Sequence, residues 1–308
     1  CVLDSIATDK SAGIKLSSDV TGYVSVKAGT EAKIDLNGHS ITGGTGAAEA
    51  SPYDQNPTVK NAGKLTINGS GEVKAVRTAD SAVYNTNTGT ATLNGGTYKA
   101  AHWYILRNEG NMTINSGVKA SNLENNTYSA EATTILNGVT SHGGQGTATA
   151  HMTINGGDFA GYYNVIKNGD HYADLTVNGG TFTVPEYNAP AGSTPITKLN
   201  VINNYNDCTV TIHGGTFLNV PNNTLDHVLA KHETTAKDFV VTGGTFSADP
   251  STYVASGYVV SKSGSNYAVS AYIPPKTNTD TTTTPTGTVK TTTTTTPDVT
   301  TTATGQVT

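Results

Sequence analysis

Two short aromatic groups are the best candidates for ligand binding. His102-Trp103-Tyr104 and Gly161-Tyr162-Tyr163 occupy equivalent places, because each comes just before an apolar-basic-Asn phrase. Exposed aromatic rings stack on the faces of sugars and contribute strongly to protein interfaces. The sequence therefore predicts binding at Trp103, Tyr104, Tyr162 and Tyr163. The alternative interpretation is that these rings pack at the end of a coil, beneath a loop.

A third group contains the closest gathering of acid–base side chains: Asp170-His171 with Asp174, beside Lys167. Such residues can bind a metal ion or move a proton, but this arrangement is more typical of a solvated turn. His232-Glu233 lacks the His-Glu-x-x-His spacing that places two zinc ligands on one helix face. The sequence therefore predicts no catalytic residue, no metal ligand and no cofactor.

The positions of the carboxylates test the main alternative function, that of a polysaccharide-degrading enzyme. Lyases of this kind hold Ca²⁺ with clustered Asp and Glu beside a basic residue, and glycoside hydrolases place carboxylates close together. Here the aspartates are scattered, and Arg77 and Arg107 are the only arginines. An enzyme with a site built from loops remains the alternative to a non-enzymatic protein.

Composition indicates which elements must position these residues. Only 13% of the 308 residues are charged, against roughly 25% in an average soluble domain, so few helical surfaces are expected. Thr, Val, Tyr, Asn and Gly, which favour strands and tight turns, are abundant instead, and the fold class is all-β. The net charge of −5 predicts no nucleic-acid partner. No apolar run is long enough for a transmembrane helix, so we expect no membrane insertion.

One phrase recurs along the chain, an apolar-Thr-apolar strand that ends in Asn-Gly and is often followed by Gly-Thr-Phe. Alternating apolar positions are typical of a half-buried strand, and Asn-Gly tolerates the positive φ of a tight corner. A second phrase, apolar-x-Asn, lies between the copies. Nine copies of the first phrase have their corner residue at Asn37, Asn68, Asn94, Asn115, Asn137, Asn155, Asn178, His213 and Thr242.

Units of this kind bury their apolar faces only when they are stacked. The sequence therefore predicts a single-stranded right-handed parallel β-helix, a solenoid of about nine to ten coils with three short strands each. We expect the corner asparagines to form one hydrogen-bonded ladder, and the Thr of each phrase to line up on the outer face. An interior stack is expected from Phe159, Phe182, Phe217 and Phe246. The alternative, a sandwich of hairpins that turn at Asn-Gly, requires matched strands on both sides of each Asn-Gly, and the two sides differ.

Both ends of the repeat carry a family resemblance. Near the start, Ile34-Asp35-Leu36-Asn37-Gly38-His39-Ser40-Ile41 has the form of a first coil, and Gly243-Gly244-Thr245-Phe246 precedes a tyrosine-rich cap. Through these residues the chain resembles the pectin-lyase-like β-helix domains of adhesin-like surface proteins from Gram-positive, gut-type bacteria. The resemblance covers about residues 10–272. It implies an extracellular or cell-wall-associated location and no defined catalytic chemistry.

The expected organisation has four parts: an N-terminal cap with the first coil (1–43), coils with edge loops (44–246), a C-terminal cap (247–275) and a Thr/Pro-rich stalk or linker (276–308). Insertions at Gly44–Thr58, Pro185–Lys198 and Asn219–Asp226 all follow the Gly-Thr-Phe type of strand. From residue 277 onward 19 of 32 residues are Thr, and such a segment is expected to be disordered because it buries too little apolar surface.

Two cysteines cannot provide a disulfide framework. Cys1 and Cys208 would lie about 30 Å apart along the rod, whereas a disulfide needs Cα atoms about 5.5 Å apart. We therefore expect no bridge between them; Cys1 could instead be lipidated, paired with another chain or a boundary residue.

Three functions stay open. The favoured pair are an adhesin-like module, monomeric within this chain, that binds a glycan or a host protein, and a rigid spacer on a Thr-rich stalk. The third is the polysaccharide lyase or glycoside hydrolase considered above.

Overall fold

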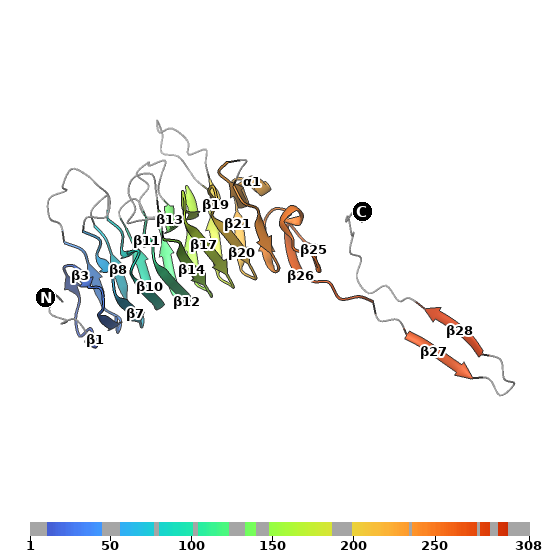
Figure 1. Cartoon of the computed structure of the whole chain (residues 1–308), viewed down its shortest axis with the longest axis horizontal. Coiled ribbons are helices and arrows are strands. Elements are labelled where there is room, and N and C mark those ends of the chain that lie inside the picture. The colour runs from blue at the N-terminus through green and yellow to red at the C-terminus, as the bar shows by residue number, and fades with distance from the viewer. Residues whose placement is uncertain are drawn as a thin grey trace.

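The computed structural model describes residues 11–44, 56–76, 80–100, 104–122, 133–139, 148–186, 199–233 and 236–275, and the backbone of 278–283 and 289–294. Most of these residues form a parallel β-helix whose coils stack along one axis (Figure 1). The predicted fold class, an all-β solenoid of parallel coils, is confirmed. Trp103 and Cys1 lie outside the described residues.

The first and second strands of successive coils belong to one large parallel sheet. The nine first strands are β1 (Ser11–Lys15), β4 (Glu31–Asp35), β7 (Lys64–Asn68), the start of β10 (Thr90–Lys99), the start of β12 (Asn111–Ser121), β14 (Ala150–Ile154), β17 (Ala173–Val177), β20 (Thr209–Ile212) and β23 (Phe239–Val241). The second strands are β2 (Val20–Thr21), β5 (Ser40–Thr42), β8 (Glu72–Lys74), the ends of β10 and β12, β15 (Asp158–Ala160), β18 (Thr181–Val184), β21 (Thr216–Asn219) and β24 (Gly244–Phe246).

The third strands form a separate parallel sheet of eight, which we call the third sheet. It closes each coil because six of its strands carry the second phrase, apolar-x-Asn, with the apolar residue and the Asn buried, whereas β3 and β22 end in Val26 and Lys231. Its members are β3 (Val24–Val26), β6 (Val59–Asn61), β9 (Val83–Asn85), β11 (Leu106–Asn108), β13 (Thr133–Asn137), β16 (Asn164–Asn168), β19 (Asn200–Asn204) and β22 (Leu229–Lys231).

The C-terminal end of the rod is covered by an antiparallel hairpin. β25 (Tyr258–Ser263) pairs with β26 (Asn266–Ala271), and β26 also pairs antiparallel with β24. The helical elements are one turn each, α1 (Leu225–Val228) and a 3₁₀ turn at Ser251–Tyr253. In the Thr-rich tail, β27 (Asn278–Thr283) and β28 (Val289–Thr294) pair with each other, which differs from the expected unstructured stalk and agrees with the high strand propensity of Thr.

The interior stack forms as predicted. Phe159, Phe182, Phe217 and Phe246 are fully buried at one position of four successive coils, and their ring centroids are 4.9–5.1 Å apart. Parallel register forces this arrangement, because each Phe pairs with the Phe of the next coil. Stacked rings fill the interior of these four coils and so help to fix their register.

Asparagines form two ladders, where the sequence predicted one. The exposed ladder follows the first strands, with amide-to-amide distances of 2.6–2.9 Å: Asn68, Asn94, Asn115, Asn155 and Asn178. The buried ladder follows the third strands, with distances of 2.6–2.9 Å: Asn61, Asn85, Asn108, Asn137, Asn168 and Asn204.

The predicted ladder was therefore wrong at two positions. Asn137 belongs to the buried ladder, because β13 pairs with β11 and β16 of the third sheet and not with a first strand. Asn37 is in neither ladder; it adopts a positive φ of 49° and donates its side-chain amide to the Leu16 carbonyl. The first-strand phrase and the third-strand phrase both end in apolar-x-Asn or a close variant. Only the burial of the residues around Asn137 shows that it belongs to a third strand.

Candidate binding surface

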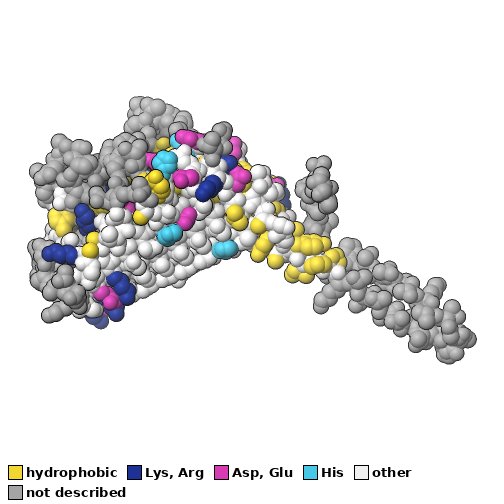
Figure 2. All heavy atoms as spheres, in the orientation of Figure 1, with side chains coloured by type: hydrophobic (Ala, Val, Ile, Leu, Met, Phe, Trp, Pro, Cys, Tyr) yellow, Lys and Arg dark blue, Asp and Glu magenta, His cyan; other side chains and the backbone are white. Residues whose placement is uncertain are grey.

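From β10 onward the outer face of the first strands presents mainly Thr and Asn, whereas β4 and β7 carry Glu31, Lys33, Asp35 and Lys64. Six threonines stack in register on this face, as the sequence predicted for this position: Thr66, Thr92, Thr113, Thr153, Thr176 and Thr211. The exposed asparagine ladder runs beside them. Figure 2 shows this face as a broad area with few charged or apolar side chains.

Charged and aromatic side chains also lie on the outward side of the third sheet. Arg107, in the middle of β11, is only 4% exposed. Its guanidinium lies 4.5 Å from the ring centre of Tyr84 in the coil before, and donates to the buried carboxylate of Glu109. A buried charge is tolerated only when it is paired and hydrogen-bonded in this way.

A second charged group lies farther along the same face. The Lys167 ammonium is 2.9 Å from the Asp170 carboxylate and 4.4 Å from the ring centre of Tyr205. Tyr205 in turn stacks on His232 of the next coil, with ring centroids 3.8 Å apart. Lys167, Tyr205 and His232 therefore form a continuous contact across the outer face.

The structure does not bring the acid–base residues singled out in the sequence into one site. Lys167 and Asp170 are paired, but Asp174 accepts from the Thr209 hydroxyl (2.5 Å) and lies 3.2 Å from His151. His171 turns toward the next coil, where its Nδ1 is 3.3 Å from the Asp207 carboxylate. These residues join adjacent coils at the corner between the third and first strands.

Of the four predicted aromatic residues, the three that the structure describes are buried or partly buried. Tyr104 is buried, with 6% of its surface exposed, because it leads into the buried Ile105 and Leu106. Tyr162 and Tyr163 are partly buried between β15 and β16. Tyr172, in the corner between β16 and β17, is exposed, and sequence reasoning missed it. Corner length gives no signal for it, because four residues also join β3 to β4 and β9 to β10.

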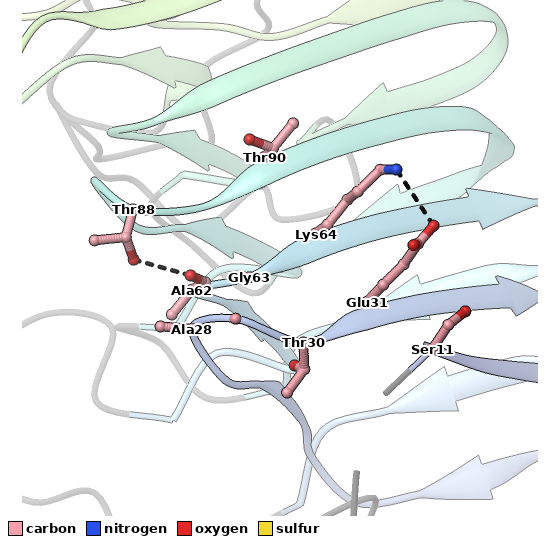
Figure 3. Close-up of a pocket in the computed structure, with 10 residues that line it drawn as sticks. Ser11, Ala28, Thr30, Glu31, Ala62, Gly63, Lys64, Thr88 and Thr90 are labelled. Atoms are coloured by element: carbon pink, nitrogen blue, oxygen red, sulfur yellow. Dashed lines mark hydrogen bonds and ion pairs between the residues drawn. The ribbon is translucent and has the colours of Figure 1, made fainter. Parts of the chain in front are cut away.

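A shallow groove of about 550 Å³ lies near the N-terminal end (Figure 3). The short corner at Ala62-Gly63 lies between the longer corners 27–30 and 86–89, which leaves a notch lined by small and hydroxyl-bearing residues. Glu31 is 3.4 Å from both Lys64 and Lys33. The groove therefore offers hydroxyls beside a neutralised acid.

Carboxylate electrostatics do not favour proton donation to a substrate. Burial tends to raise the pKa of Glu31, but hydrogen bonds from Lys64 and Lys33 outweigh burial and leave that pKa below its ordinary value. The backbone N–H and hydroxyl of Ser40 lower the pKa of Asp19. A glycosidase acid needs a raised pKa, and both carboxylate shifts in the described ranges are downward.

Cys208 is a free, buried thiol in the corner that follows β19. Burial raises its pKa from the ordinary 9.0 to about 12, with smaller contributions from nearby carboxylates. In a Cys1→Ser variant, we expect Cys208 to resist alkylation by iodoacetamide at pH 8 until the protein is unfolded, because the thiolate is the reactive form. Mass spectrometry of the alkylated protein measures this directly, and rapid labelling of the native protein at pH 8 would contradict it.

The same shift has a consequence for stability. A thiol whose pKa is higher in the folded state than in the unfolded state favours folding fully below the unfolded pKa. This contribution should decrease as the pH rises from about 9 toward 12. The parent protein should therefore lose more stability than Cys208→Ala over this interval.

Together these observations define a parallel β-helix whose first strands present mainly Thr and Asn from β10 onward, with paired charges and aromatic rings on the outward side of the third sheet. Within the described ranges, no three His, Cys, Asp or Glu side chains are grouped as metal ligands. No helix in those ranges is long and apolar enough to cross a membrane. Comparison of the chain with protein-family models, curated proteins and solved structures gives no match.

Proposed function

We propose that this chain is a non-enzymatic, adhesin-like binding module, displayed outside the cell on its Thr-rich tail, with a glycan or a host protein as partner. One observation carries the proposal: Tyr172, His171 and Asp207 are exposed at corners that follow the third strands, while the first strands from β10 onward present mainly Thr and Asn. A repeat protein needs no such asymmetry to stack its coils, because the stacking energy comes from the interior.

The rod itself supports a role in display. Backbone pairing joins the coils along the rod; the two Asn ladders reinforce the middle coils, and the Phe stack reinforces the last four. Such a structure projects a surface without bending it. The resemblance to Gram-positive surface β-helices supports an extracellular or cell-wall-associated location for the chain.

The pairing of the carboxylates favours binding over catalysis. Glu109 is held by Arg107, Asp170 by Lys167, and Glu31 by two lysines. A hydrolase needs one protonated and one free carboxylate beside the scissile bond. Acids that are held in ion pairs are not free to supply either group.

Binding of the full chain to an array of plant, cell-wall and mucin glycans, in parallel with immobilised host-surface proteins, tests the proposal. We expect saturable binding to one class, with Ca²⁺ present or absent and with the ligand recovered intact. Shortened oligosaccharide products would establish the enzyme instead. Absence of binding to every glycan and protein would overturn the binding role and leave the spacer.

A further inference from the structure

We infer that the two stacked corners 169–172 and 205–208 form a glycan-binding subsite for neutral pyranose sugars, in which Tyr172 stacks on the sugar ring and Asp207 accepts its hydroxyls. This inference rests on the proposed binding function and assigns it a place and a ligand class. The subsite consists of His171, Tyr172, Asn206 and Asp207, which we call the corner subsite.

The two corners have the same length and lie in adjacent coils. Four residues join β16 to β17, and four join β19 to β20. Because β16 pairs with β19 and β17 with β20, the corners stack in register, and His171 of one corner contacts Asn206 and Asp207 of the other.

Tyr172 has an unfavourable backbone conformation for its type. Its φ is 58°, a left-handed value at which a Cβ substituent is strained. The side chain is 37% exposed. A glycine would adopt this turn without strain, whereas the tyrosine keeps its ring at the surface. Strain of this type is typical of binding sites, where the surrounding structure holds it.

Polar contacts fix the groups beside the ring. The side-chain amide of Asn206 donates to the Asp170 carbonyl at 2.6 Å and lies 3.4 Å from Nε2 of His171. Because a carbonyl only accepts, the Asn206 nitrogen must face it, and Nε2 of His171 is then the acceptor. Nδ1 of His171 carries the proton and donates to Asp207 at 3.3 Å.

The chemistry of the corner subsite selects the ligand class. A half-exposed phenol ring stacks on the apolar face of a pyranose, and a fixed carboxylate accepts hydrogen bonds from its hydroxyls. His171 and Asp207 are 54% and 56% exposed, so both are accessible to a ligand. The exposed acids Asp174 and Asp207 repel a polyuronate, which leaves neutral sugars as the favoured ligands.

Isothermal titration of the full chain with neutral hexasaccharides of glucose, xylose, mannose and N-acetylglucosamine, and with hexagalacturonate, tests the inference. We expect binding of at least one neutral hexasaccharide and none of hexagalacturonate. Tyr172→Gly and Tyr172→Ala should each weaken binding about tenfold or more, as loss of one stacked ring implies. Tyr172→Phe should bind within about threefold of the parent, because it retains the ring.

Stability separates binding from folding. Tyr172→Gly should keep a Tm equal to or above that of the parent, because glycine relieves the strained φ. Tyr272→Ala is the matched control, since Tyr272 is an exposed tyrosine in the C-terminal cap, and its binding should be unchanged.

Three results would overturn the subsite. These are binding that survives Tyr172→Gly and Tyr172→Ala, binding of hexagalacturonate alone, and no binding of any hexasaccharide. If the protein array still shows a partner, the proposed binding function stands while the subsite fails.

Discussion

Replacing Asn108 with alanine should lower the free energy of unfolding by about 3–5 kcal/mol, because it leaves several buried polar groups without partners. Asn108 donates to Asn137 (2.8 Å) and accepts from Asn85 (2.7 Å), so it links three coils. Its amide also reaches the carbonyls of Gly110 and His151, each at 3.1 Å. Urea unfolding followed by circular dichroism measures the loss as a lower midpoint.

Asn115→Ala in the exposed ladder is the control for this prediction. Asn115 makes the same two ladder contacts, to Asn94 (2.6 Å) and Asn155 (2.9 Å). Because water replaces a lost partner at an exposed site, this variant should lose less than about 1 kcal/mol. Equal losses at Asn108 and Asn115 would show that burial of the ladder does not determine its energetic importance.

A mid-rod defect also tests the cooperativity of the solenoid. Repeat proteins are stabilised by interactions between neighbouring coils, so a weak coil can separate the rod into parts that unfold independently. Asn108 lies in the fourth of eight third strands. A second unfolding transition in Asn108→Ala, absent from Asn115→Ala, would locate this boundary.

The sequence predicted the stacked coils well, because their signal is periodic. Thr176 and Phe182 repeat at fixed places in each phrase, and parallel register turns such repetition into columns. The ladders were harder, since Asn115 and Asn137 end similar phrases. Only the environment of the preceding strand separates them: β12 begins with alternating burial, whereas all five residues of β13 are buried.

The candidate site was less predictable, because it depends on contacts between coils. Lys167 and Tyr205 are 38 residues apart in sequence, yet they meet at 4.4 Å because their strands are adjacent in the third sheet. The aromatic dipeptides suggested exposure, but Tyr104 enters a buried strand. Tyr172 lies in no repeated phrase, and the sequence does not show the positive φ that it adopts in its corner.

Phe182→Ala should cost about 3–5 kcal/mol of stability, and more if the neighbouring rings cannot close the cavity. Phe182 is fully buried between Phe159 (5.1 Å between centroids, 17° between planes) and Phe217 (5.0 Å, 6°). Truncation therefore removes both the buried ring and two stacked pairs, each worth about 0.5–1.5 kcal/mol beyond burial. Thermal and urea unfolding of the full chain measure the combined loss.

Phe182→Leu separates the two contributions. Leucine keeps most of the buried volume but removes the stacking, so this variant should lose only about 1–2 kcal/mol. The difference between the alanine and leucine variants then reports the cavity left between the coils of β15 and β21. If Phe182→Leu were as damaging as Phe182→Ala, ring stacking rather than filled volume would hold these coils in register, and the aromatic column would be more than a space-filling core.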